Sequence, residues 1–128
     1  MDASIALANV LPDEESSLAY RVLDLLESES ALAPTLWLYE VASALRIGQI
    51  RKRVDQEFAD AVIAGVKELN IEFEHPDGVE LLRLSRQTGL TVYDASYLAL
   101  CLKHQLPLAS LDRRLVSSAR ELGIEVLT

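Results

Sequence analysis

The chain has 128 residues, of which 50% are hydrophobic and 25% charged, and this excludes a disordered protein and permits one buried core. Its net charge of −8 argues against a polyanionic partner unless a local basic patch holds it. The longest uncharged stretch, residues 30–39, is far shorter than the ~20 residues that span a bilayer, so no membrane partner is expected. A single cysteine, Cys101, excludes an internal disulfide and agrees with a cytoplasmic location.

Helices and strands alternate along the chain, according to the spacing of apolar residues and the positions of capping residues and glycines. Helices are expected, in chain order, at residues 3–10, 14–28, 35–47, 54–69, 77–88, 94–104 and 112–122. Strands are expected at residues 31–33, 71–73, 106–110 and 124–127. Helix starts are assigned to Thr35, Asp77, Asp94 and Asp112. Helix stops are assigned to Gly48, Gly89 and Gly123.

This alternation predicts an α/β sandwich with a mainly parallel sheet, formed as a single domain over residues 1–128. In such sheets, ligands bind beyond the carboxyl ends of the strands. Asp112 directly follows the strand expected at residues 106–110, so it is a candidate for that edge.

Two copies of the phrase Asp-Ala-Ser stand at residues 2–4 and 94–96, each ahead of an apolar run. Each aspartate can cap a helix, because its carboxylate can accept free backbone N–H groups. Glu40 falls on the apolar side of its expected helix. A carboxylate is costly to bury there unless it is paired or bound to metal. Simple capping by Asp94 and Asp112, and a solvent-facing Glu40, are the competing interpretations.

Asp2, Glu40, Asp94 and Asp112 can converge at one end of the sheet. Two carboxylates 4 Å apart repel by roughly 4 kcal/mol at an effective dielectric constant near 20, so protons or a cation must relieve the repulsion. Ligation by oxygen alone favours Mg²⁺ or Mn²⁺ over Zn²⁺. Such an ion can bind a phosphate and orient a water molecule for hydrolysis.

A local basic patch follows the helix that carries Glu40, consisting of Arg46, Arg51, Lys52 and Arg53 without an intervening acid. Such a patch can hold phosphates on an acidic protein, although overall repulsion should make binding weak and sensitive to salt. A solvated helix end is an equally good interpretation of these four residues.

Several segments, taken in order, resemble the PIN-domain ribonucleases, and most closely the VapC-type toxins of bacterial and archaeal toxin–antitoxin pairs. The matching segments are residues 2–4, 34–45, 90–100, 106–115 and 123–127. Each motif is weak alone, but together they span essentially the whole chain. The resemblance implies a PIN-like three-layer sandwich with a mainly parallel central sheet and helices on both faces.

The resemblance also implies an endoribonuclease that binds Mg²⁺ or Mn²⁺ through the acids matching Asp2, Glu40, Asp94 and Asp112. These four are the candidate catalytic and metal-binding residues, with Asp2 and Asp94 the most direct candidates for metal contact. The basic patch is the candidate RNA-binding surface. A homodimer and inhibition by a small cognate antitoxin are further implications of the family.

One departure from the family concerns the start of the sheet. Family members usually have several apolar residues before the first aspartate, and these form the central strand, whereas only Met1 precedes Asp2 here. The first strand is therefore expected to be truncated, either because residues are missing upstream or because the chain has lost the strand. The truncation favours an alternative function, a catalytically inactive PIN-like binding module that acts only in complex formation.

Overall fold

The computed structural model describes residues 1–8, 10–11 and 15–128. Its helices are α1 (Ala3–Leu7), α2 (Ser17–Leu25), α3 (Trp37–Ile50), α4 (Gln56–Gly65), α5 (Gly78–Thr88), α6 (Val92–His104) and α7 (Arg113–Glu121). The strands are β1 (Ala31–Pro34) and β2 (Ile71–Glu74), and a short 3₁₀ helix, Val66–Glu68, follows α4. The break expected near residues 11–13 and the helix start expected at Glu14 fall at least partly outside the described residues.

The sheet is short and parallel. β1 pairs with β2 in a register that places Ala31 opposite Ile71 and Pro34 opposite Glu74. The strands expected at residues 106–110 and 124–127 are reduced to one parallel bridge between Leu108 and Val126. Met1 and Asp2 connect the β1–β2 pair to the pair formed by the Leu108–Val126 bridge. The amino group of Met1 bonds to Leu32 of β1, and the N–H of Asp2 bonds to Ala109.

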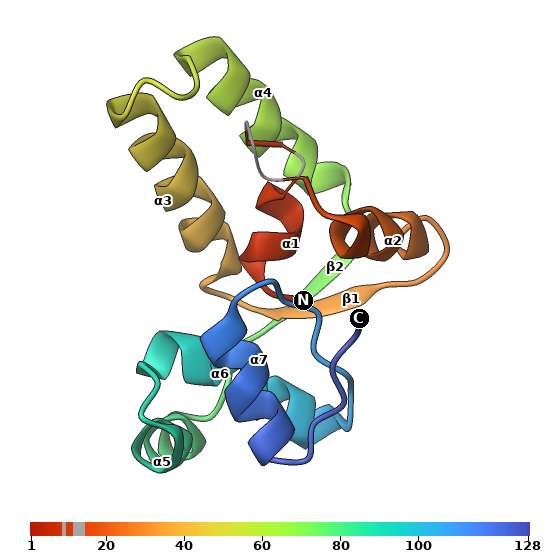
Figure 1. Ribbon diagram of the computed structural model, residues 1–128, viewed down its shortest axis with the longest axis vertical. Helices are drawn as coiled ribbons and strands as arrows, with labels where there is room; N and C mark the ends of the chain where they lie inside the picture. The colour runs from red at the N-terminus through yellow and green to blue at the C-terminus, as the bar shows by residue number, and fades with distance from the viewer. Residues whose placement is uncertain (9, 12–14) are drawn as a thin grey trace.

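Helices cover the sheet on both sides, as predicted for an α/β sandwich (Figure 1). α1, α2, α3 and α4 lie on one side of β1 and β2, and α5, α6 and α7 lie on the other. The most deeply buried side chains include Trp37, Ile5, Leu84, Leu98 and Leu108, which fill the space between these layers. None of the described helices is both long and apolar enough to cross a membrane.

Three helix ends on the α5–α7 side follow the local sequence signals closely, namely both ends of α5 and the start of α7. The Asp77 carboxylate accepts the N–H of Val79 at the start of α5, and Gly89 ends that helix with a φ of 75°. Asp112 caps α7 through the N–H groups of Arg114 and Leu115. These three predictions are confirmed.

Three other helix ends differ from the sequence-based expectation. α3 does not begin with a cap from Thr35, whose hydroxyl bonds instead to Nδ1 of His75. It also continues through Gly48 to Ile50 rather than stopping at the glycine. α6 begins before Asp94, because the hydroxyl of Thr91 accepts the Asp94 N–H and serves as the cap.

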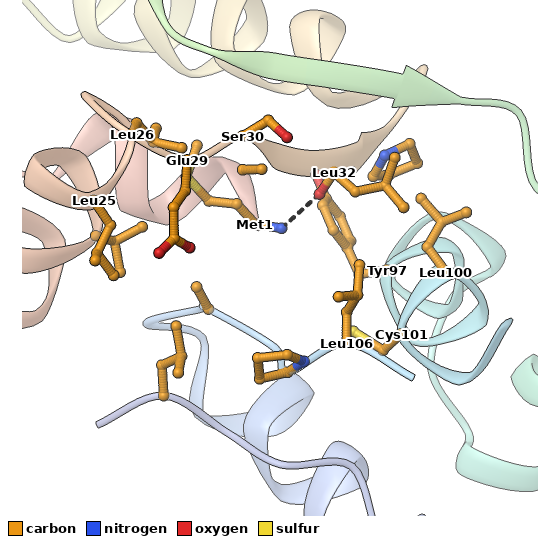
Figure 2. Close-up of a pocket in the computed structure, with 16 residues that line it drawn as sticks. Met1, Leu25, Leu26, Glu29, Ser30, Leu32, Tyr97, Leu100, Cys101 and Leu106 are labelled. Carbon is orange, nitrogen blue, oxygen red and sulfur yellow. Dashed lines mark hydrogen bonds between the residues drawn. The ribbon is translucent and has the colours of Figure 1, made fainter. Parts of the chain in front are cut away.

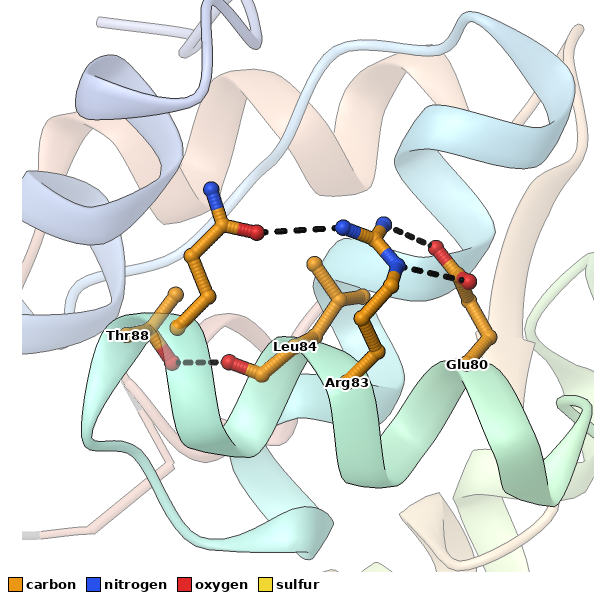
Figure 3. A network of polar contacts seen from close by, with 5 residues as sticks. Glu80, Arg83, Leu84 and Thr88 are labelled. Carbon is orange, nitrogen blue, oxygen red and sulfur yellow. Dashed lines mark hydrogen bonds and ion pairs between the residues drawn. The ribbon is translucent and has the colours of Figure 1, made fainter.

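The outer face of α5 carries a network of polar side chains (Figure 3). Arg83 donates to the carboxylate of Glu80 one turn before it and to Gln87 one turn after it. The bond from Arg83 lowers the pKa of Glu80. Leu84, next to Arg83 in sequence, is fully buried against the core, so α5 has one polar face and one packed face.

Candidate active site

The four acids predicted from the sequence lie at the starts of four helices. Asp2 immediately precedes α1, Glu40 and Asp94 lie in the first turns of α3 and α6, and Asp112 caps α7. The charges of Asp2, Asp94 and Asp112 all act to raise the pKa of Glu40, after the larger effect of its burial. The helix starts face this cluster with partial positive charge, which favours anions there.

Asp2 is buried, with 8% of its surface exposed, and is held by two serines from opposite ends of the chain. Its Oδ2 atom accepts hydrogen bonds of 2.7 Å from the hydroxyls of Ser4 and Ser110. The Ser110 hydroxyl in turn accepts the N–H of Asp112 at 3.0 Å. Asp2 occupies the cap position of α1, but its side chain makes no capping hydrogen bond. The expectation that the Asp2 carboxylate caps this helix is therefore wrong.

Glu40 is half-buried and bonded to Tyr97, a residue for which the sequence analysis had assigned no role. The Tyr97 hydroxyl donates to Oε1 of Glu40, and the tyrosine itself is 2% exposed. Burial raises the pKa of Glu40 and so do the neighbouring acids, while the bond from Tyr97 lowers it. Tyr97 follows Asp94 by three residues on α6, so the two side chains share one face of the helix. That spacing is the sequence signal that could have identified Tyr97.

Asp94 is half-buried beside two of the other acids. Burial raises the pKa of its carboxyl group, and the charges of Asp112 and Asp2 raise it further. A hydrogen bond from Thr91 and the charge of Arg114 act in the opposite direction. The guanidinium of Arg114 is fixed nearby by a 3.1 Å bond to the carbonyl of Gly89. Burial is the largest cause of the raised pKa of both Glu40 and Asp94, and the neighbouring acids add to it, so a bound cation would stabilise the ionised carboxylates.

Asp112 has two roles in this geometry. Its Oδ1 atom accepts the N–H groups of Arg114 and Leu115 at 2.9 and 3.0 Å. Within the described part of the chain, Oδ2 has no hydrogen-bond partner. Capping and participation in the acidic cluster are therefore compatible, because each uses a different oxygen of the carboxylate.

The acidic cluster fits a hard divalent cation in its donor chemistry. All four candidate side chains supply carboxylate oxygens, the ligands that Mg²⁺ and Mn²⁺ prefer. Among the described residues, no three His, Cys, Asp or Glu side chains stand close enough to enclose an ion as they lie. Metal binding therefore requires side chains of the cluster to reorient toward the ion.

A groove of about 610 Å³ runs from the acidic cluster along α3. It is lined by Leu36, Tyr39, Glu40, Ser43, Ala44, Ile47, Thr91, Tyr93 and Asp94. Two tyrosine rings lie largely in solvent within it, with exposed fractions of 77% for Tyr39 and 64% for Tyr93. The groove therefore combines carboxylates with exposed aromatic surface.

The four residues of the basic patch are exposed at the far end of α3 from Glu40. Arg46 lies on the helix, Arg51 ends it, and Lys52 adopts a left-handed backbone with a φ of 58°. The groove extends from Glu40 to Ile47, the neighbour of Arg46. The patch thus lies beyond one end of the groove, outside the acidic cluster.

The sequence and the structure of this chain both resemble those of known proteins. The model of the PIN domain matches residues 1–122, so the chain belongs to the PIN domain family. Among solved structures, the chain is similar to PAE2754 from Pyrobaculum aerophilum, with 27% sequence identity and a TM-score of 0.71. The alignment covers 91% of this chain and 76% of that one. No curated protein matches the chain. PIN domains are generally metal-dependent nucleases that act on RNA.

Proposed function

We propose that this protein is a metal-dependent endoribonuclease and the toxin component of a toxin–antitoxin pair. The observation that carries the proposal is that burial, and in addition the charges of neighbouring acids, raise the pKa of Glu40 and of Asp94. Carboxylates arranged in this way are costly to keep ionised without a cation. Membership of the PIN domain family supports the same conclusion.

Asp2 and Asp94 are proposed as the main metal ligands, and Glu40 and Asp112 complete the set. When bound, Mg²⁺ or Mn²⁺ supplies an activated water and neutralises charge on the phosphate. The serine bonds to Asp2 keep its carboxylate oriented, and Tyr97 does the same for Glu40. The starts of α3, α6 and α7 add partial positive charge where the phosphate would lie.

The groove offers a path for single-stranded RNA. Exposed aromatic rings bind successive bases by stacking without selecting their sequence. Tyr39 and Tyr93 are the aromatic side chains beside the acids. We therefore expect bases to stack on these rings while the backbone phosphate approaches the carboxylates.

Metal dependence is the test of this function. Cleavage of RNA is expected with Mg²⁺ or Mn²⁺ and is expected to be lost in EDTA, because water is the nucleophile and the carboxylates alone do not activate it. Since the 2′-hydroxyl of the RNA takes no part, the products should carry 5′-phosphate and 3′-hydroxyl ends. Gel analysis of end-labelled RNA measures both properties. Full-rate cleavage in EDTA, or 2′,3′-cyclic phosphate ends, would contradict the proposed chemistry.

The basic patch is expected to hold the RNA backbone without reading bases. Reversing charge in Arg51→Glu combined with Lys52→Glu should weaken binding similarly across RNA sequences. The salt dependence should become shallower by about 0.7 in log–log slope for each phosphate that the protein no longer neutralises. Fluorescence anisotropy across a salt series measures both effects.

A matched control changes net charge equally at a distance from the groove. Lys67→Glu combined with Arg86→Glu reverses two exposed cations that lie outside the groove and the acidic cluster. This control is expected to bind RNA nearly as well as the parent and to keep its salt slope. Equal losses of affinity in both double variants would show that overall charge, rather than the patch, governs RNA binding.

An antitoxin and a second copy of the chain are the proposed protein partners. Two residues that motivated an association surface, Trp37 and Leu45, are buried in the core instead, while Leu36 is only partly covered. Other apolar side chains on α3 are exposed, namely Leu38, Tyr39, Ile47 and Ile50. Exposed apolar surface of this kind is typical of protein interfaces, and it supports the partner proposal.

The alternative function is a PIN-like binding module without turnover. It is favoured by the orientation of the acidic side chains, no three of which enclose a metal site as they lie in the described part of the chain. The metal-dependent cleavage assay separates the two functions. A folded protein that binds RNA or protein partners but cleaves no RNA with either metal would support the binding module.

A further inference from the structure

Three of the four acids share a pattern of hydrogen bonds. Each of Asp2, Glu40 and Asp112 has one carboxylate oxygen bonded to protein donors, and its other oxygen has no partner among the described residues. An oxygen whose lone pairs already accept hydrogen bonds has less capacity to bind a metal ion. The pattern therefore limits how each of these carboxylates can bind a cation.

At Asp2, both hydrogen bonds fall on the same oxygen. Oδ2 accepts the hydroxyls of Ser4 and Ser110 at 2.7 Å each, and these bonds use both of its lone pairs. Ser110 is 3% exposed and Asp2 is 8% exposed, so little water can compete for the bond between them. Oδ1 of Asp2 is the oxygen that remains available to a cation.

Asp112 repeats the pattern with backbone donors in place of hydroxyls. Its Oδ1 atom accepts two N–H groups from the first turn of α7. These donors belong to the helix backbone, so they cannot rotate away when a cation arrives. Ser110 connects this acid to the previous one, because its hydroxyl donates to Asp2 and accepts the N–H of Asp112.

At Glu40, a buried phenol occupies one oxygen. The Tyr97 hydroxyl donates to Oε1, whereas Oε2 has no hydrogen-bond partner in the part of the chain that the structure describes. The ring of Tyr97 lines a mostly apolar cavity of about 200 Å³ together with Leu32, Leu100 and Cys101 (Figure 2). This packing fixes the ring, and the low exposure of Tyr97 leaves its hydroxyl little water to bond to in place of Glu40.

We propose that these hydrogen bonds make the acidic cluster selective for cations that take one oxygen from each carboxylate. Tyr97 and Ser110 are the positioning residues that set this selectivity. The inference rests on the proposed function, because it concerns the metal of the proposed nuclease. Mg²⁺ demands octahedral geometry with short bonds, and Mn²⁺ suits the same oxygen ligands. Ca²⁺ takes more oxygens and often binds both oxygens of one carboxylate, so the cluster disfavours it.

The test measures the affinity of the RNA-free protein for Mn²⁺ and Ca²⁺. Electron paramagnetic resonance follows free Mn²⁺, and Ca²⁺ is added as the competitor. Tyr97→Phe frees Oε1 of Glu40, and Ser110→Ala frees a lone pair on Oδ2 of Asp2. Each substitution gives Ca²⁺ a ligand that Mn²⁺ does not need. The affinity for Ca²⁺ relative to Mn²⁺ should rise about threefold in each variant and about tenfold in the double variant.

Ser96→Ala is the matched control for Ser110→Ala. Ser96 is 1% exposed, and its hydroxyl donates to the carbonyl of Tyr93 rather than to a carboxylate. The control therefore removes a buried hydroxyl but frees no carboxylate oxygen, and it should keep the parent's ratio of Ca²⁺ affinity to Mn²⁺ affinity. An unchanged ratio in both Tyr97→Phe and Ser110→Ala, or an equal rise in the control, would overturn the proposal.

Infrared difference spectra provide a second measurement, which Tyr97→Phe supplies even if Ser110→Ala does not fold. A bidentate carboxylate has a smaller separation between its antisymmetric and symmetric stretching bands than a monodentate one. Mg²⁺ should give monodentate bands in the parent, and Ca²⁺ should give an added bidentate band in Tyr97→Phe. Bidentate bands with Mg²⁺ in the parent would contradict the assignment.

The same experiments separate this inference from the proposed function. A parent protein that binds neither Mn²⁺ nor Mg²⁺ would overturn the metal-dependent function, and the selectivity with it. A parent that cleaves RNA with Mn²⁺, but whose ratio of Ca²⁺ affinity to Mn²⁺ affinity is the same in the two variants, would overturn the selectivity alone.

Discussion

Asp94→Asn is expected to lower the rate of RNA cleavage about a thousandfold or more while the fold is retained. The variant loses a proposed metal ligand, and it also removes a charge that is unfavourable in this place, since burial and then the charges of Asp112 and Asp2 raise the pKa of Asp94. Thermal melts with Mg²⁺ and with EDTA measure the ligand role directly. The midpoint gained from Mg²⁺ should be smaller in the variant than in the parent, and an equal gain would show that Asp94 is not a ligand.

The same variant should change how stability depends on pH. Glu40 and Asp94 have raised pKa values in the folded protein, so the folded state binds protons more tightly than the unfolded chain does. Their contribution to stability is full below about pH 4 and is lost as pH rises through the raised values. In EDTA, the parent should therefore lose stability over this range, and Asp94→Asn should lose less. Asp77→Asn is the control, because it neutralises a carboxylate outside the cluster and asparagine still caps α5.

Trp37→Ala should have the largest effect on stability, lowering the free energy of unfolding by about 3–5 kcal/mol. Trp37 is 1% exposed at the start of α3 and packs against Phe73 of β2, with ring centroids 5.9 Å apart. Trp37 precedes Glu40 by three residues, so the substitution also loosens the helix turn that carries the acid. Urea denaturation measures the change.

Trp37→Phe separates packing from polarity at this position. The indole Nε1 is buried without a hydrogen-bond partner in the described part of the chain, so phenylalanine removes an unsatisfied N–H while it also shortens the buried ring system. Its cost should be well below that of alanine. Tyr39→Ala on the same helix, where the side chain is 77% exposed, should change stability by about 0.5 kcal/mol or less. A phenylalanine variant as unstable as the alanine variant would contradict this account.

The fold class was predictable where local chemistry decides the structure. Asp77 and Gly89 bound α5 because a cap and a left-handed glycine act within a few residues. The prediction that Gly48 ends the helix was wrong, because the glycine lies inside α3 at a point of close packing. A Cβ added at Gly48 would lie 3.2 Å from Cγ2 of Val54. The left-handed residue after α3 is Lys52, which sequence statistics do not favour there.

The candidate site was predictable in its composition and less so in its contacts. The four acids could be selected because each is unusual in its own segment, and in the structure the charges of Asp2, Asp94 and Asp112 act on Glu40. The partners of Asp2 and Glu40 depend on tertiary packing across 108 and 57 residues. No local pattern specifies that the hydroxyl of Ser110 bonds to Asp2. The wrong prediction that Asp2 caps α1 considered only the residues next to it in sequence.

The serine bridge between Asp2 and Ser110 also determines when the site can exist during synthesis. The two residues are 108 positions apart, which at ~5–20 residues per second separates their synthesis by about 5–20 s. Asp94 and Asp112 follow Glu40 by 54 and 72 residues, so a nascent polypeptide that ends before Asp94 carries Asp2 and Glu40 without their partners. For the proposed nuclease, the ribosome would therefore have to synthesise the chain through Asp112 before the four carboxylates could first come together.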